Sequence, residues 1–492
     1  MYKLILLWLI LVLSFTDIKS QNFNIVDSND VFFDFINSKC FNNASVSFYA
    51  YNLDDNKKIY SYNENLSLVP ASVLKTVTTA TALQVLRPFY RFKTKLQYTG
   101  TIDSLGNLNG NLIIKGGGDP TLGSERFKKT YYSPFFLDKW IDTIKKSGIK
   151  NINGNLIIDD RIFDNNIPTT WVWGDIGNYY GAGAFGISIF DNTYKLILAS
   201  PDTAKGPVKI KQIIPDIDSM RMENYLLSSK RNRDMAYIFG DPLTNIRLVQ
   251  GTIPLKRDSF IVKGSIPNPP KFLGKYFLKY LINNNLKLNG TITIINNKDF
   301  NYKTDTIPKK NIYTTKSPYL KNIITLTNTY SINLYAQHIF KAISLRQVKQ
   351  ATNITAANYI KNFWRKKGIN TSGMELYDGC GLSRYNVITA KQIAEILIYM
   401  NKKSKYFKYF YNSLPIAGKS GTLSRTFRNK YLKNNLRAKS GTITKVKNYA
   451  GYFKTLKGKN IAFVIMINNY NGSSKNINNK IQNLLTKIYF RN

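Results

Sequence analysis

The chain has 492 residues, which is more than one ordinary hydrophobic core organises, so two or three domains are expected. A hydrophobic fraction of 43% with 13% aromatic residues excludes an intrinsically disordered chain. The formal net charge is +41, but the lysines are spread along the whole chain and no nucleic-acid-binding motif accompanies them. We therefore expect no nucleic-acid partner, and an anionic polymer is the partner that this charge favours.

The first residues are typical of an export signal. Lys3 supplies a positive start, residues 4–15 are almost wholly apolar, and Ser20 is a small residue suited to cleavage. The apolar run is about 12 residues, shorter than the roughly 20 that span a bilayer. Residues 1–20 are therefore predicted to be a cleaved signal peptide, with an uncleaved membrane anchor as the alternative.

Cysteine and histidine are scarce. Cys40 and Cys380 are too few for a disulfide scaffold, and the sequence leaves open whether they pair. His338 is the sole histidine, which argues against a histidine/cysteine metal site and leaves a serine–histidine triad only one candidate base. We therefore expect no metal site of this kind.

A predicted β-hairpin leads to a buried helix. Residues 44–51 alternate apolar and polar side chains, and a second strand is expected near residues 59–62. Residues 70–86 then carry apolar side chains at close to helical spacing, and Pro70 suits the first turn. This helix carries few charges and is predicted to be well buried.

Ser72 and Lys75 are three residues apart and share one face of the first turn of that helix. A hydroxyl beside an amine at a buried helix start is what nucleophilic catalysis without histidine requires. The amine must be neutral to take the proton, so its pKa has to fall from about 10.4 toward 7. Because Ser-x-x-Lys is common by chance, a helix start with a solvated lysine is the competing interpretation unless partners follow.

Residues 93–265 are predicted to form a β-rich insertion with up to two subdomains. The pattern Asn-Gly-Asn-Leu-Ile-Ile at 109–114 returns at 153–158 and, more loosely, at 289–294, each time as a turn that leads into a short strand. The spacing of the copies is too irregular to predict a solenoid. The glycines at 116–118 lack the spacing of a phosphate-binding loop, so a tight turn is predicted there.

The remainder is mostly helical from 318 to 402, with strands predicted at 439–443, 449–453 and 461–467 and a final amphipathic helix. This order predicts an α+β fold in which the first and last parts of the chain share one antiparallel sheet covered by helices. The predicted domains are the discontinuous one formed by residues 21–92 and 266–492 and the insertion at 93–265.

Two later motifs offer partners for Ser72. Ser331 and Asn333 supply a hydroxyl and an amide, and only a loop or helix start aims both into one cleft; an N-cap serine is the competing interpretation. The run Lys439-Ser440-Gly441-Thr442 supplies a cation, a hydroxyl and a gap where a substrate backbone reaches a strand edge. A second copy at 419–422 competes with it, but strands follow only the later copy, which is therefore preferred.

Together, Ser-x-x-Lys, Ser-x-Asn and Lys-Ser-Gly in this order resemble the penicillin-binding proteins and serine β-lactamases. The long interval between Ser72 and Ser331 resembles the branch with a large insertion after the first motif. That branch is the D-alanyl-D-alanine carboxypeptidase/endopeptidase family of the penicillin-binding protein 4 type (peptidase family S13). Further stretches that match this family are residues 117–122, 378–384, 414–418 with 421–423, and 436–442.

The resemblance implies a serine β-lactamase/transpeptidase-like domain and acyl transfer at D-Ala-D-Ala bonds of peptidoglycan, with β-lactams as inhibitors. It also implies a reaction that needs no metal and no organic cofactor. Ser72 is implied as nucleophile with Lys75 as its base, Ser331 as a proton relay and Asn333 as a peptide-orienting group. The backbone N–H groups of Ser72 and Thr442 are implied as the oxyanion hole. The residues implied to hold the terminal carboxylate are Lys439, Ser440 and Thr442, with Gly441 between them.

Cys380 stands where the family usually has serine. The hydrogen bonding of the loop at residues 378–384 is therefore expected to differ from that of the family, without an effect on a catalytic role. A carboxylate of the insertion, Asp159 or Asp160, is a candidate to meet a substrate amine. The N-terminal segment predicts an exported, periplasmic protein, and the sequence leaves a peripheral association with membrane or cell wall open. The alternatives are a serine β-lactamase, a non-catalytic cell-wall-binding protein and a polyanion-binding protein.

Overall fold

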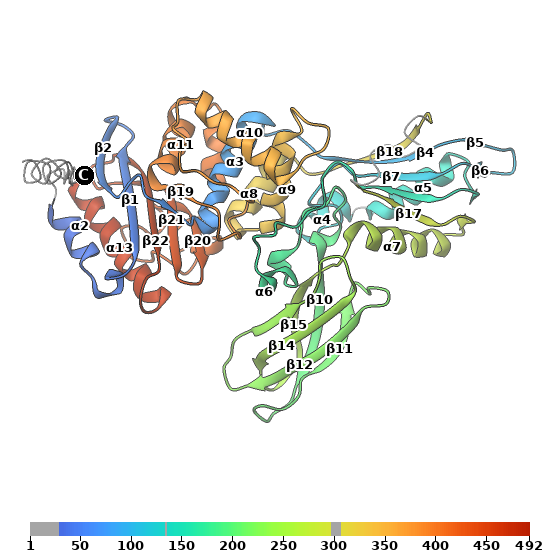
Figure 1. The fold of residues 1–492 in the computed structure, drawn as a ribbon, viewed down its shortest axis with the longest axis horizontal. Helices are drawn as coiled ribbons and strands as arrows, with labels where there is room; N and C mark the ends of the chain where they lie inside the picture. The colour runs from blue at the N-terminus through green and yellow to red at the C-terminus, as the bar shows by residue number, and fades with distance from the viewer. Residues whose placement is uncertain (1–28, 133–134, 297–306) are drawn as a thin grey trace, which may run out of the picture.

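The computed structural model describes residues 29–132, 135–296 and 307–492, so the predicted signal peptide lies outside the described residues. At one end of the molecule lies a five-stranded antiparallel sheet with the order β2-β1-β22-β21-β20 (Figure 1). Its strands are β1 (Ser45–Asn52), β2 (Lys57–Tyr62), β20 (Arg437–Ile443), β21 (Val446–Lys454) and β22 (Asn460–Asn468). Because β1 lies between β2 and β22, both ends of the chain share this sheet, and the predicted α+β architecture is confirmed.

Helices cover both faces of this sheet. On one face α2 (Asn29–Ile36) and α13 (Ser474–Arg491) pack against it, and the apolar stripe of α13 is buried from Ile477 to Ile488. On the other face a helical layer surrounds α3, whose residues from Leu74 to Leu83 are all buried. The helices of this layer are α3 (Leu74–Val85), α8 (Leu320–Tyr330), α9 (Asn333–Ser344), α10 (Asn353–Lys366), α11 (Ala390–Lys403) and α12 (Phe407–Ser413), and the strands β3 (Ser67–Leu68) and β19 (Ile388–Thr389) pair beside them.

The insertion extends away from the helical layer as two lobes (Figure 1). The first lobe holds a sheet of order β17-β9-β7-β4-β18, a smaller sheet of order β16-β8-β6-β5, and helices packed against them. Its elements are β4 (Lys93–Tyr98), β5 (Thr101–Ile102), β6 (Asn107–Asn109), β7 (Leu112–Lys115), α4 (Lys128–Tyr131), α5 (Phe136–Lys146), β8 (Asn151–Ile152), β9 (Leu156–Asp159), α7 (Pro269–Asn283), β16 (Lys287–Leu288), β17 (Ile292–Ile295) and β18 (Lys310–Lys316). The predicted end of the insertion at residue 265 is therefore too early, because β18 pairs with β4 and closes this sheet at Lys316.

The three copies of the Asn-Gly repeat lie side by side in that lobe. Strands β7, β9 and β17, which follow the three turns, are parallel neighbours. The turns are joined by asparagine side chains, since Asn111 Oδ1 accepts from Asn155 N at 2.8 Å and Asn155 Oδ1 accepts from Thr291 N at 3.0 Å. The three copies therefore form a short solenoid-like stack, which their irregular spacing in the sequence does not predict. The spacing is irregular because different elements of the chain lie between successive copies.

The second lobe consists of two three-stranded sheets of order β11-β10-β15 and β12-β14-β13. Its strands are β10 (Thr193–Ser200), β11 (Lys209–Ile214), β12 (Arg221–Ser229), β13 (Met235–Phe239), β14 (Ile246–Pro254) and β15 (Arg257–Ser265), and the short helix α6 (Trp173–Ile176) lies at the approach to it. One continuous apolar core includes residues of both lobes, such as Trp140 from the first and Val249 from the second. The insertion is thus two lobes on a shared core.

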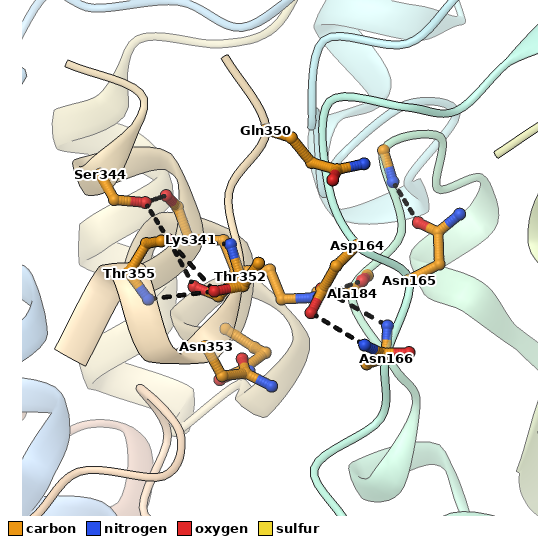
Figure 2. Close-up of polar contacts among 12 residues, drawn as sticks. Asp164, Asn165, Asn166, Ala184, Lys341, Ser344, Gln350, Thr352, Asn353 and Thr355 are labelled. Carbon is orange, nitrogen blue, oxygen red and sulfur yellow. Dashed lines mark hydrogen bonds and ion pairs between the residues drawn. The ribbon is translucent and has the colours of Figure 1, made fainter. Parts of the chain in front are cut away.

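A buried ion pair joins the insertion to helix α9 (Figure 2). The Lys341 ammonium donates to Asp164 Oδ1 at 2.7 Å, and the two side chains are 1% and 9% exposed. One turn earlier on α9, His338 is fully buried, with Nε2 at 2.9 Å from Ser188 Oγ and Nδ1 at 2.9 Å from the Gly118 carbonyl. This serine–histidine contact has no access to solvent and fastens the insertion to the helix that begins with Asn333.

Candidate active site

Ser72 lies in a one-turn 3-10 helix, Ala71–Val73, that runs directly into α3. Ala71 has a left-handed backbone with φ of 46°, a conformation that costs a non-glycine residue free energy and persists only where neighbours enforce it. The side chain of Asn448 on β21 supplies that enforcement by donating to the carbonyls of Val69 at 2.9 Å and Pro70 at 2.8 Å. The predicted helix start is thus anchored to the sheet, and sequence reasoning missed Asn448 because an asparagine within a strand carries no motif.

Lys75 connects the first two motifs. Its Nζ lies 2.8 Å from Ser72 Oγ and 2.7 Å from Asn333 Oδ1, and it also donates to the Cys380 carbonyl at 2.6 Å. The residue is fully buried, and burial lowers the pKa of its ammonium to about 8, although Cys380 and Asp378 act in the opposite direction. A lysine with such a pKa is partly neutral near physiological pH and is poised to accept the Ser72 proton.

Ser331 and Asn333 meet Lys439 and Lys75 because of the backbone between α8 and α9. Ser331 ends α8 in the left-handed conformation, with φ of 60° and ψ of 39°, and Asn333 is the first residue of α9. The N-cap position of α9 belongs to Ile332, so the competing interpretation of Ser331 as an N-cap is wrong. The Asn333 amide is fixed from the other side by donating from Nδ2 to the Tyr180 carbonyl at 2.8 Å.

Lys439 joins the third motif to the second. It lies on β20, the edge strand of the sheet, and its Nζ donates to Ser331 Oγ at 2.9 Å and to the Ser440 carbonyl at 2.7 Å. Burial, together with the positive charges of Lys75 and Lys447, lowers the pKa of the Lys439 ammonium. All three motifs therefore converge, and Lys439 rather than Lys419 faces Ser331.

Gly441 lies directly against the start of the helix that carries Ser72. A Cβ on Gly441 would lie 2.6 Å from the Pro70 carbonyl oxygen and 3.1 Å from the Ser72 nitrogen. The space that the missing side chain leaves is therefore filled by the start of the Ser72 helix, and the approach of a substrate backbone to the edge of β20 stays a prediction. The absence of a side chain at Gly441 therefore allows the edge strand to pack directly against the backbone that carries Ser72.

Ser440 and Thr442 lie at the outer edge of the sheet. Ser440 Oγ donates to Thr422 Oγ1 at 2.8 Å, and Thr442 is exposed. Thr422 belongs to the other copy of the Lys-Ser-Gly-Thr run, at residues 419–422. That copy therefore supplies one hydroxyl beside the site. No pattern in the sequence predicts this contact, because it arises only when residues 419–422 fold against β20.

The loop that carries Cys380 is organised by Asp378. Its carboxylate accepts from the backbone N–H groups of Cys380 at 3.0 Å, Gly381 at 2.6 Å and Ser383 at 2.6 Å, and from Trp171 Nε1 of the insertion at 2.8 Å. Because Lys75 uses the backbone carbonyl of Cys380, the cysteine-for-serine departure leaves that contact in place. Both Cys40 and Cys380 are buried free thiols, so they do not pair.

Asp159 and Asp160, the predicted partners of a substrate amine, are not available to bind one. Asp159 is paired with Arg161 at 2.9 Å, and Asp160 is buried, where desolvation raises its pKa well above the ordinary value. Asp175 of α6 is the acid that lies beside Tyr180, whose carbonyl holds Asn333; burial raises the pKa of Asp175, and the Arg384 charge lowers it. The sequence missed Asp175 because its position depends on the fold of the insertion.

Within the described ranges, histidine, cysteine and acidic side chains form no group of three or more that is suited to hold a metal ion. In the same ranges, no helix combines the length and the apolar character needed to cross a bilayer. The groups that the three motifs bring together are the Ser72 and Ser331 hydroxyls, the Lys75 and Lys439 amines and the Asn333 amide.

Residues 35–488 match the model of the D-Ala-D-Ala carboxypeptidase 3 (S13) family. The chain belongs to this family. It is 26% identical over 437 residues to the D-alanyl-D-alanine carboxypeptidase DacB of Haemophilus influenzae, covering 87% of this chain and 86% of that protein. The penicillin-sensitive carboxypeptidase A of Dictyostelium discoideum is 25% identical, covering 92% and 90% of the two chains.

The S13 fold is also found among solved structures. The crystal structure of penicillin-binding protein 4 of Haemophilus influenzae superposes with a TM-score of 0.78, at 23% identity, over 94% of this chain and 99% of that one. The same protein complexed with a β-lactam gives a TM-score of 0.74, with 93% and 99% of the chains covered. This likeness confirms the predicted serine β-lactamase/transpeptidase-like fold with its large insertion.

Proposed function

We propose that this serine-type D-Ala-D-Ala carboxypeptidase of the S13 family acts on peptidoglycan stem peptides through an acyl-enzyme on Ser72. The observation that carries the proposal is the contact of 2.8 Å between Lys75 Nζ and Ser72 Oγ at a fully buried lysine whose pKa is lowered. Family membership supplies the substrate class and the reaction.

Each residue of the three motifs has one role in this reaction. Neutral Lys75 takes the Ser72 proton as Oγ attacks the carbonyl of the penultimate D-alanine, a positioned proton transfer worth about 10²–10⁴-fold. The backbone N–H groups of Ser72 and Thr442 stabilise the oxyanion. Ser331, in contact with Lys439, passes a proton to the departing amine, and Asn333 orients the peptide. Water then hydrolyses the ester and frees Ser72.

Ser440 and Thr442 bind the terminal carboxylate of the substrate beside Lys439. The close approach of Gly441 to Ser72 supports this arrangement, because it fixes the edge strand at the nucleophile. β-Lactams are expected to acylate the same serine, as the complex of the Haemophilus influenzae relative with a β-lactam suggests. An endopeptidase activity on cross-linked peptides is a further part of the proposal.

The decisive experiment is peptide mass spectrometry after exposure to penicillin, together with an assay of D-alanine release from a D-Ala-D-Ala peptide. We expect one covalent adduct on the peptide that carries Ser72, and loss of both adduct and release in Ser72→Ala. An adduct that decays as fast as it forms would instead identify a serine β-lactamase. Unchanged D-alanine release in Ser72→Ala would show that Ser72 is not the nucleophile and would favour a non-catalytic cell-wall-binding protein.

We also propose that the protein is exported to the periplasm after cleavage within residues 1–20. The short apolar run at 4–15 and a substrate that lies outside the cytoplasm support this location. The net charge of +41 favours a peripheral association with the anionic cell wall. Cell fractionation and the N-terminal sequence of the mature protein test the export step.

A further inference from the structure

A further buried lysine lies beside the strand that is proposed to bind the substrate carboxylate. Lys447 on β21 is paired across the sheet with Thr442 on β20, and its Nζ donates to Thr442 Oγ1 at 3.0 Å. The residue is 8% exposed. Its ammonium also lies 5.6 Å from the centre of the Tyr449 ring, on the same face of the strand.

This cation has no anionic partner among the residues that the structure describes. Burial lowers the pKa of Lys447 to about 8, and no carboxylate raises it. Taking an ammonium out of water without a counter-charge is unfavourable, and a methionine of similar length would fill the space without that cost. A buried and unpaired cation next to a substrate-binding side chain is the pattern expected where the counter-charge arrives with a ligand.

The hydrogen bond from Lys447 also fixes how Thr442 can act. Because Thr442 Oγ1 accepts the lysine proton, the hydroxyl proton of this exposed threonine remains free to be donated outward. A carboxylate that accepts that proton would have the Lys447 charge directly behind the hydroxyl, and hydrogen bonds to charged groups are the strong ones. Lys439 is already engaged by Ser331 and the Ser440 carbonyl, so the two cations have separate tasks.

We propose that Lys447 is a specificity-determining residue that selects substrates with a free C-terminal carboxylate by placing a positive charge behind Thr442. The inference rests on the proposed function, since it assigns a role in substrate selection at the same site. It goes beyond the three motifs because Lys447 lies on the neighbouring strand and belongs to none of them.

The test compares two peptides that differ only at the end of the chain: one ends in D-Ala-D-Ala with a free carboxylate, the other carries a C-terminal carboxamide. In Lys447→Met we expect kcat/KM for the carboxylate peptide to fall by about 10–100-fold, mostly through KM, because the positive charge behind the Thr442 hydroxyl no longer strengthens its hydrogen bond to the carboxylate. The carboxamide peptide should change less than about 2-fold, because it carries no charge for Lys447 to attract.

Three further variants sharpen the result. Lys447→Gln keeps a donor for Thr442 but removes the charge, so it should lose selectivity as Lys447→Met does, and it serves if the methionine variant fails to fold. Lys447→Arg keeps the charge and should restore most of the preference for the carboxylate. Lys445→Met is the matched control, because Lys445 is an exposed lysine of the same hairpin, and neither peptide should be affected.

Equal losses on the two peptides, or an unchanged preference in both Lys447→Met and Lys447→Gln, would overturn the inference while leaving the proposed function standing. A wild-type protein that releases no D-alanine and gives no penicillin adduct would overturn the proposed function and this inference with it. The two failures are therefore distinguished by the wild-type protein alone.

Discussion

The protein buries lysines in two different ways. At the joint between the insertion and α9, Lys341 is 1% exposed and meets the Asp164 carboxylate at 2.7 Å. At the candidate active site, Lys75 and Lys439 are fully buried, yet each donates only to hydroxyl or carbonyl oxygens, with the Asn333 amide oxygen as a further acceptor of Lys75. Burial lowers the pKa of all three lysines, but only that of Lys341 is countered by a direct ion pair.

This difference indicates two roles: Lys341 stabilises the fold, whereas Lys75 and Lys439 take part in the proposed reaction. A buried pair is costly to break from one side, because the remaining charge loses its partner. A buried lysine without a carboxylate contributes little to holding the fold, and its lowered pKa is useful only where a neutral amine or a free positive charge is needed. Replacing lysines at the two places should therefore produce opposite patterns of activity and stability.

The largest effect is expected for Lys75→Met. Removing the base should slow penicillin acylation of Ser72 by about 10³–10⁴-fold, since Ser72 would lose its proton acceptor. The thermal unfolding midpoint should change little, because methionine fills a buried space in which a charge was unfavourable. Stopped-flow acylation and circular dichroism measure the two quantities. A loss of folded protein in this variant would show that the cleft lysine is structural after all.

Lys341→Met should show the reverse pattern. It leaves Asp164 buried without its partner, and breaking such a pair typically costs about 3–5 kcal/mol of stability. Urea unfolding of the variant measures the loss, and the double variant Lys341→Met with Asp164→Leu is the control, because it removes both charges and should recover most of it. Full stability in the single variant would mean that the ion pair does not hold the joint.

The pH dependence of acylation tests whether Lys75 acts as the base. The reactive form of Lys75 is neutral, and its pKa is lowered to about 8, so the rate should rise with pH up to about 8 and then level off. Between pH 8 and pH 6 the neutral fraction falls by about 50-fold, and the acylation rate should fall with it. A rate that is flat over this range, with the protein folded throughout, would exclude Lys75 as the base.

The smallest effect is expected for Cys380→Ser. Lys75 contacts the backbone carbonyl of residue 380, and the loop is held by Asp378, so exchanging the thiol for a hydroxyl alters neither contact. Acylation should change less than about 2-fold by the same assay. A larger change would mean that the side chain at residue 380 helps to set the pKa of Lys75.

The sequence predicted the parts of the site that lie in local motifs. Ser72 and Lys75 share a helix turn, and helical spacing alone places them together. The left-handed conformation of Ser331, which brings it to Lys439 and Asn333 to Lys75, cannot be predicted from the residue types. Asn448, Thr422 and Lys447 act across strand pairings or loop contacts, so their partners became visible only when β20, β21 and residues 419–422 were placed side by side.

The limits of the fold prediction have the same origin. Alternation and apolar spacing indicated the hairpin, the α3 helix and the last three strands. The end of the insertion was misplaced because β18 joins the sheet of β4 from more than two hundred residues away along the sequence. The stacking of the three Asn-Gly turns was missed because each copy specifies its own strand, whereas the asparagine ladder between copies is a tertiary contact.

The missing side chain of Gly441 has a consequence for how this enzyme can change. The spacing between the nucleophile and the edge strand is set by backbone against backbone, with no flexible atoms in between to absorb an error. Even one added methyl group would push these two rigid pieces apart. New substrate preferences are therefore expected to arise from residues around this contact, such as those of the adjoining strand and the insertion, while the contact itself stays fixed.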